Sequence, residues 1–144
     1  KKREALFQQI IRDAKSYCIE IKTAQEIDAS NIYALTQNTM DTIALKYANC
    51  AILTDCMPLP SFPNAISLVK GDQQSISIAA ASILAKVTRD MMILYDKLYP
   101  EYGFASNKGY GTKKHIDAIK QYGVCDIHRL TYGPCHPIEQ LTLF

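Results

Sequence analysis

The amino-acid sequence predicts a mixed α/β protein, and two observations indicate this class. Apolar residues recur at helical spacing in several long segments, and two short β-rich segments each run into an acidic residue, Asp55 and Asp72. The 144 residues are 48% hydrophobic and 21% charged, which is ordinary for a globular protein and enough for one domain with a core.

The first half of the chain is expected to alternate between helix and strand. Residues 3–15 carry apolar side chains at helical spacing, and residues 17–21 (YCIEI) alternate like a strand. Residues 26–48 repeat the helical spacing, with Ser30 as a plausible N-cap. Residues 51–55 are apolar and β-rich, and are expected to form a second strand.

Proline and small residues shape the middle of the chain. Three prolines mark residues 56–64 as a loop, because proline lacks a backbone donor and has a fixed φ. Residues 65–70 follow as a strand. Residues 76–98 are expected to form a long helix, nearly all apolar at its start and therefore buried on several sides.

The last third is expected to contain one further helix. Residues 99–108 are expected to form a loop, and Thr112 is expected to cap a helix over 113–122 that stops at Gly123. Residues 124–144 are expected to be irregular.

The charge distribution leaves two interpretations open. The net charge of +2 does not itself indicate a nucleic-acid partner. Many basic residues nevertheless lie between positions 70 and 129, a part of the chain that also holds Asp72, among them Lys70, Lys86, Arg89, Lys108, Lys113, Lys114, Lys120 and Arg129. They could face a phosphodiester substrate or form an ordinary solvated surface.

The cysteines favour a reducing, cytoplasmic location. The chain has five, Cys18, Cys50, Cys56, Cys125 and Cys135, an odd number without a CxxC pair. This pattern argues against a disulfide framework or a zinc site. The sequence shows no apolar stretch of membrane-spanning length and no signal peptide, so no membrane partner is expected.

The two strand-end acids are candidates for a metal site. A carboxylate at the end of a buried strand is costly unless a cation, a basic side chain or backbone donors pair with it. Asp55 and Asp72 could together bind a hard divalent cation such as Mg²⁺, which prefers oxygen ligands. The alternative is that each acid caps a turn or a helix.

Six segments together resemble a known family. They are EIDASNIYALT (26–36), ILTD (52–55), VKGD (69–72), AAASILAKVTRD (79–90), YGFASNKGYGTKKH (102–115) and IHRLTYGP (127–134). In this order, the sequence resembles ribonuclease HII, the bacterial type 2 ribonuclease H. The resemblance implies a ribonuclease H-like mixed sheet flanked by helices. It also implies a Mg²⁺- or Mn²⁺-dependent endonuclease that cleaves RNA in RNA–DNA hybrids and single ribonucleotides in duplex DNA.

The sequence also departs from the family pattern. The family has an N-terminal strand with an Asp-Glu pair and a Gly-Arg-Gly loop, which this chain does not contain, and Cys56 stands where glycine usually follows the third acid. The chain is therefore expected to be a piece of a longer enzyme that lacks the first strands and is inactive alone. The alternative function is a non-catalytic hybrid-binding or clamp-associated module.

The resemblance assigns roles to individual residues. Asp55 and Asp72 match the third and fourth active-site acids, which are the expected catalytic and metal-binding residues. Tyr110, with Lys108 and Gly109, is expected to stack on the sugar at the RNA–DNA junction. A tyrosine packed on the core is the alternative.

Three further residues are nucleic-acid-binding candidates. Lys86 could contact a phosphate, Asn31 could touch the substrate backbone, and Arg129 could face a phosphate beside His128. The alternatives are helix capping for Asn31 and a structural role for the His128–Arg129 pair. Arg89 and Asp90 are expected to be a salt-bridged helix face.

The chain ends in a candidate partner motif. Residues 1–137 are expected to form the partial catalytic domain and 138–144 a tail. Within this tail Gln140, Leu141, Leu143 and Phe144 resemble the pentapeptide that binds the bacterial sliding clamp, with two apolar anchors. A tail that folds back on its own core is the alternative. The protein is expected to be a monomer.

Overall fold

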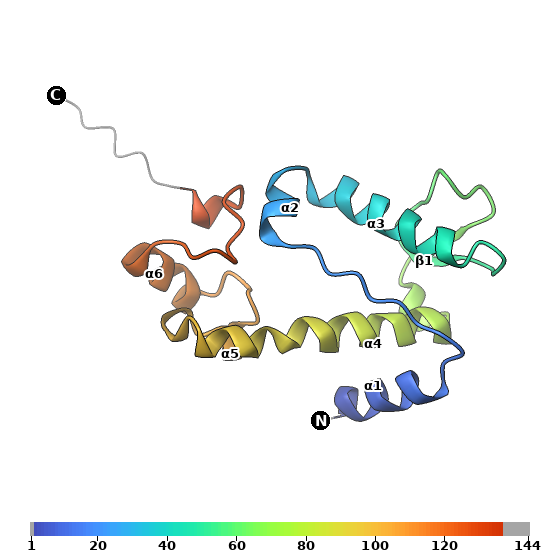
Figure 1. The fold of residues 1–144 in the computed structure, drawn as a ribbon, viewed down its shortest axis with the longest axis horizontal. Coiled ribbons are helices and arrows are strands. Elements are labelled where there is room, and N and C mark those ends of the chain that lie inside the picture. The colour runs from blue at the N-terminus through green and yellow to red at the C-terminus, as the bar shows by residue number, and fades with distance from the viewer. Residues whose placement is uncertain (1, 137–144) are drawn as a thin grey trace. The chain divides into compact units, whose positions relative to one another are not determined.

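The computed structural model describes residues 2–136, apart from the side chains of Met92 and Ile93. The chain forms two compact units (Figure 1). Unit 1 comprises Lys1–Ile21 and Ser30–Met91, and unit 2 comprises Lys22–Ala29 and Met92–Phe144. Helices alternate with a small sheet, so the predicted mixed α/β class is confirmed.

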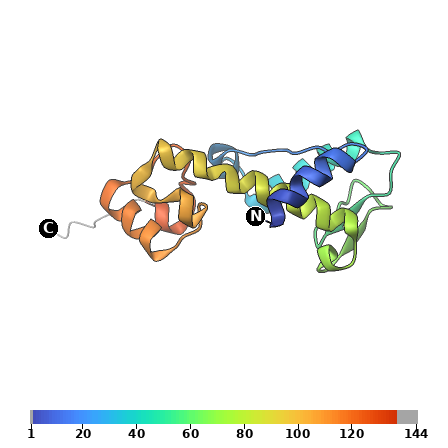
Figure 2. The ribbon, with the colours of Figure 1, turned by 90° about the horizontal axis from the view of Figure 1, so that it is seen from below.

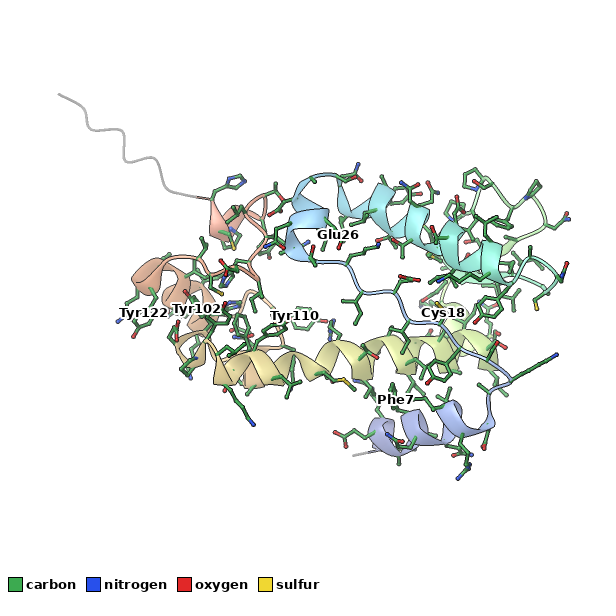
Figure 3. All side chains as sticks on the ribbon, viewed as in Figure 1. Phe7, Cys18, Glu26, Tyr102, Tyr110 and Tyr122 are labelled. Carbon is green, nitrogen blue, oxygen red and sulfur yellow. The ribbon has the colours of Figure 1, made fainter. Side chains whose placement is uncertain are left out.

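Unit 1 is organised around the packing of α1 (Lys2–Asp13) against α4 (Ile76–Asp90), which cross in Figure 2. The helix predicted over residues 3–15 is confirmed as α1. The side chain of Phe7 is buried and points toward α4 in Figure 3. Burying an aromatic side chain of this size stabilises the pair by about 1.5–3 kcal/mol.

Two parallel strands form the sheet of unit 1. β1 (Leu53–Asp55) pairs with β2 (Ile66–Leu68), with Leu53 opposite Ile66 and Asp55 opposite Leu68. Both strands were predicted, and both are shorter than predicted. The proline-rich segment between them is a loop, as expected.

The predicted strand over residues 17–21 is wrong, because this segment has no regular secondary structure. A strand needs a neighbour to accept and donate its backbone hydrogen bonds. The alternating pattern is present, but Tyr17 is 48% exposed and Ile21 is 71% exposed, so no apolar face is buried. An ion pair of 2.6 Å from Glu20 to Lys46 Nζ ties the segment to α3 (Ile32–Lys46).

The helical region predicted over 26–48 is confirmed, and it is divided into two helices. α2 (Ala24–Asp28) begins with a capping box between Thr23 and Glu26. α3 begins after Asn31 and not after Ser30, because the Asn31 side chain accepts the Ala34 N–H at 2.8 Å.

The long helix predicted over 76–98 is α4 followed by a 3₁₀ segment, Met91–Lys97. The expectation that its first turns are buried on several sides is wrong. Ile76 is 90% exposed, whereas Ile78 and Leu84 are buried. Only Ile78 and Leu84 are fully buried along α4.

Unit 2 is built from short helical elements around an aromatic core. They are the 3₁₀ turn Pro100–Tyr102, α5 (Phe104–Asn107), α6 (Lys113–Tyr122) and the 3₁₀ turn Gly133–Cys135. The loop predicted over 99–108 thus contains two helical turns, because Tyr102 and Phe104 must both reach the core. The prediction for α6 is confirmed, including its caps Thr112 and Gly123.

No helix within residues 2–136 is both long and apolar enough to cross a membrane. All five cysteines have free thiols.

Candidate functional site

The structure brings the two predicted acids to one edge of the sheet in unit 1. Asp55 ends β1 opposite Leu68, the last residue of β2. The N–H of Gly71, the residue before Asp72, donates to Asp55 Oδ1 at 2.9 Å. We call Asp55 and Asp72 the acid edge. Parallel pairing places both carboxyl ends on the same side, which is where ligands collect in α/β sheets.

The alternative role of Asp72 as the cap of α4 does not match the structure. Ser75 is the N-cap, and its hydroxyl accepts the Ile78 N–H at 3.5 Å. Asp72 lies in the preceding 3₁₀ turn, Gly71–Gln73, and is exposed. Asp55 is also exposed, with one oxygen bonded to the Gly71 N–H as a turn-stabilising carboxylate.

The acid edge has the donor chemistry of a hard-cation site. Mg²⁺ typically binds one or two protein carboxylates and completes its shell with waters and substrate phosphates. Asp55 and Asp72 fit that description as exposed oxygen ligands. Among residues 2–136, no group of three or more His, Cys, Asp and Glu side chains could hold a metal. The acid edge would therefore supply part of a coordination shell.

Left-handed backbone flanks both acids. Cys56 (φ 61°) directly follows Asp55, and Lys70 (φ 54°) precedes Asp72 by two residues. Glycine adopts this conformation without a Cβ penalty, whereas other residues are strained there. The family's usual glycine after the third acid is therefore explained by the backbone, because the residue at this position, Cys56 here, has a positive φ. Such strain concentrates at functional sites.

Close packing fixes the turn that carries Asp72. A Cβ on Gly71 would stand 2.6 Å from Ile78 Cδ1 and 3.3 Å from Leu68 Cβ. Glycine is therefore needed for space at this buried position, and the turn is held between β2 and the first turn of α4.

The tyrosine candidate lies in unit 2, in a loop that we call the tyrosine loop (Lys108–Gly111). Lys108 and Gly109 both have positive φ values, 53° and 79°. Asn107 is buried and holds the loop from below: its amide donates to Tyr102 O at 2.6 Å, and its Oδ1 accepts the Gly109 N–H at 2.8 Å. Tyr110 projects from the loop before α6 (Figure 3), and 58% of it is exposed.

The remaining candidates are distributed over both units. Lys86 is exposed on α4 in unit 1, and Asn31 caps α3 as the alternative interpretation expects. Arg129 lies in unit 2 with its guanidinium carbon 5.0 Å from the centre of the Tyr132 ring, a cation–π contact. Arg89 and Asp90 form the expected surface pair at 3.7 Å. Gln140, Leu141, Leu143 and Phe144 lie outside the described residues.

Sequence reasoning missed Asp28, which anchors the IHRLTYGP segment. Its carboxylate accepts the Leu130 N–H at 2.6 Å, and the N–H and hydroxyl of Thr131 at 3.2 and 2.5 Å. The Thr131 hydroxyl, with these backbone donors and the charge of Arg129, holds the pKa of Asp28 below its ordinary value. No local pattern reveals a contact between residues this far apart in sequence.

Comparisons with known proteins show to which family the chain belongs. The family profile described as ribonuclease HII matches residues 1–135. The chain belongs to the ribonuclease HII family. It is 50% identical over 137 residues to ribonuclease HII of Lactobacillus acidophilus, covering 93% of this chain and 55% of the relative. It is 52% identical over 137 residues to ribonuclease HII of Listeria innocua, covering 92% and 52%.

A third relative, ribonuclease HII of Francisella tularensis subsp. novicida, is 49% identical over 138 residues, with coverage of 93% of this chain and 75% of the relative. The chain thus spans about half the length of the first two relatives and three quarters of the third. The predicted family is confirmed, and the acid edge and the tyrosine loop both lie within the matched residues.

Proposed function

We propose that this chain is part of a divalent-metal-dependent endonuclease that cleaves the RNA strand of RNA–DNA hybrids and single ribonucleotides embedded in duplex DNA. One observation carries the proposal. The Gly71–Asp55 hydrogen bond joins the end of β1 to the turn that follows β2, so two carboxylates lie at the same end of the sheet in a ribonuclease HII chain.

Asp55 and Asp72 are the proposed metal-binding residues, with Mg²⁺ or Mn²⁺ as the cation. The bound metal would activate the attacking water and stabilise charge on the leaving 3′ oxygen. The chain's own contribution is to hold two oxygen ligands in fixed positions. The Gly71 N–H orients Asp55, and the packed turn at Gly71 orients Asp72.

Substrate binding is assigned to cationic and polar residues in both units. Lys86 and Arg129 are proposed to contact phosphates, and Asn31 the substrate backbone. Tyr110 is proposed to stack on the sugar at the RNA–DNA junction, with Lys108 and Gly109 shaping its loop. RNA is distinguished from DNA by its 2′-hydroxyl and sugar shape, which a stacked ring can sense.

Partners and location follow the same proposal. The protein is proposed to act as a monomer in the cytoplasm, where its five free thiols stay reduced. Residues 1–137 form the proposed catalytic part and 138–144 a tail that docks on the sliding clamp through Leu143 and Phe144.

A second candidate function is a non-catalytic hybrid-binding module. It is favoured by the lack of any three-ligand metal group among residues 2–136. Binding of a hybrid without cleavage in either metal would support this function.

The test compares Asp55→Asn and Asp72→Asn with Asp117→Asn in the full protein. Asp117 is an exposed acid on α6 and serves as the matched control. Cleavage of a duplex with one ribonucleotide is measured in Mg²⁺ and in Mn²⁺, and duplex binding is measured by fluorescence anisotropy. Both site variants should lose most turnover and still bind, whereas the control should cleave normally. Normal cleavage by Asp72→Asn would rule out its metal role.

A further inference from the structure

Two buried histidines of unit 2 form a continuous chain of hydrogen bonds that ends at the tyrosine loop. The N–H of Cys125 lies 2.9 Å from His128 Nδ1, and His128 Nε2 lies 3.0 Å from His115 Nε2. His115 Nδ1 then lies 2.9 Å from the carbonyl oxygen of Tyr110. Both histidines are buried, at 4% exposure for His115 and 7% for His128.

The backbone groups at the two ends of this series of hydrogen bonds, Cys125 N–H and Tyr110 C=O, determine which nitrogen of each histidine carries the proton. Cys125 N–H can only donate, so His128 Nδ1 accepts and the His128 proton is on Nε2. That proton is donated to His115 Nε2, so His115 carries its own proton on Nδ1. The Tyr110 carbonyl can only accept, and it receives this proton. When both histidines are neutral, each of the four ring nitrogens has a hydrogen-bond partner.

Aromatic packing keeps the rings in this arrangement. The Phe104 ring lies 5.2 Å from His115, and the Tyr102 ring lies 4.8 Å from His128, each edge to face. Tyr102 is itself held by a 3.0 Å hydrogen bond from its hydroxyl to Gly123 O. Neither imidazole can turn without disturbing a residue that is at most 2% exposed.

The backbone of Tyr110 is held on both sides. Its N–H donates to Asn107 O at 2.9 Å. Its carbonyl accepts the N–H of Thr112 at 2.8 Å and the His115 ring at 2.9 Å. The ring of Tyr110 is 58% exposed, and these backbone hydrogen bonds fix the position of the Cα from which it projects.

We propose that His115 and His128 are positioning residues that orient Tyr110 toward the sugar of the substrate. The inference rests on the stacking role given to Tyr110 in the proposed function. It assigns no proton transfer to either histidine, and it makes the neutral pair a requirement for a correctly placed tyrosine loop.

The arrangement is sensitive to acid. A proton added to His115 places two Nε2–H donors against each other, and one added to His128 places Nδ1–H against the Cys125 N–H. Titratable side chains packed against the pair include Tyr102, whose ring contacts both histidines, and Cys125, whose sulfur lies 3.1 Å from His128 Nδ1. Burial, with the neighbouring His115, lowers the pKa of His128, in agreement with a neutral pair.

The test uses two substitutions of His115 that differ in one hydrogen bond. His115→Asn retains a side-chain N–H near the position of Nδ1, so the bond to the Tyr110 carbonyl can persist. His115→Phe keeps the ring volume and removes the donor. We expect kcat/KM on a single-ribonucleotide duplex to fall about five- to tenfold in His115→Phe, as for the loss of one hydrogen bond, and to recover in His115→Asn.

A double variant separates positioning from stability. If His115 acts through Tyr110, then His115→Phe should change kcat/KM little in the Tyr110→Ala background. Equal losses in both backgrounds would overturn the proposal, because the histidine would then act elsewhere. Melting temperatures of all variants, measured in parallel, set the assay temperature at which each one is folded.

Nitrogen-15 NMR of the full protein provides a readout that is independent of activity. The expected spectrum shows His115 protonated at Nδ1 and His128 at Nε2, both neutral at pH 7.5. The amide signals of Gly109–Gly111 should move in His115→Phe and stay in His115→Asn. Reversed tautomers or unmoved amides would overturn the positioning role. Normal cleavage by Tyr110→Ala, with the expected spectrum, would refute the stacking role alone and leave loop positioning supported.

Discussion

Replacing Cys56 with glycine should stabilise the protein. Cys56 has φ 61°, and a left-handed residue with a Cβ costs about 1–2 kcal/mol. Glycine removes that cost but adds about 0.5–1 kcal/mol of chain entropy to the unfolded state. The net gain is about 0.5–1 kcal/mol, or about 2–4 °C in melting temperature for a chain of this size. The backbone bond from Cys56 N–H to Leu68 O, 2.9 Å, is retained by glycine.

Cys50→Gly is the matched control. Cys50 is also an exposed cysteine, and its φ is not positive, so glycine there relieves no strain. The control should lose about 0.5–1 kcal/mol. Both variants are compared with wild type by calorimetry and by urea unfolding, under reducing conditions. If Cys56→Gly lowers the melting temperature as much as Cys50→Gly does, the assignment of backbone strain beside Asp55 is wrong.

Three further predictions concern packing, pH and capping. Gly71→Ala should cost about 1–3 kcal/mol by overpacking, because its Cβ would meet Ile78 Cδ1 at 2.6 Å, and adding Ile78→Val should recover part of this in urea unfolding. The lowered pKa of His128 means that the folded state takes up fewer protons, so stability should be full above the unfolded pKa of about 6.5 and decline as the pH falls through the lower folded value. A melting temperature that rises as the pH is lowered from 7 to 5 would contradict this expectation. Asn31→Ala should lose about 1 kcal/mol of stability through its cap, and unchanged affinity for a hybrid duplex would limit Asn31 to that role.

Local chemistry explains which elements could be predicted from the sequence. α6 has a capping threonine, one apolar face and a terminal glycine, and each of these signals acts within a few residues. The acids Asp55 and Asp72 were found for a similar reason, because Asp55 ends one β-rich segment and Asp72 comes three residues after the last apolar residue of another. Their proximity was expected because the carboxyl ends of parallel strands lie at the same end of a sheet.

Features that depend on distant partners could not be predicted. The alternation over 17–21 satisfies a strand pattern, but a strand also needs a neighbour, which the pattern does not contain. The His115–His128 pair depends on a turn that brings the two rings together, and the contact from Asp28 to Leu130 joins residues 102 positions apart. The positive φ of Cys56 could be suspected only from the family, because cysteine carries no local signal for it.

The division into units has a consequence for how the chain folds. The boundaries fall after Ile21, Ala29 and Met91, so the chain passes between the units three times. α2, in the short segment Lys22–Ala29, joins unit 2 through Asp28 and the backbone of Leu130, 102 residues later. Closing a loop of that length costs about 2 kcal/mol more than closing one of ten residues. Unit 2 should therefore be completed only after synthesis has passed Leu130, and a nascent protein that stalls before that residue would expose α2 without its partner.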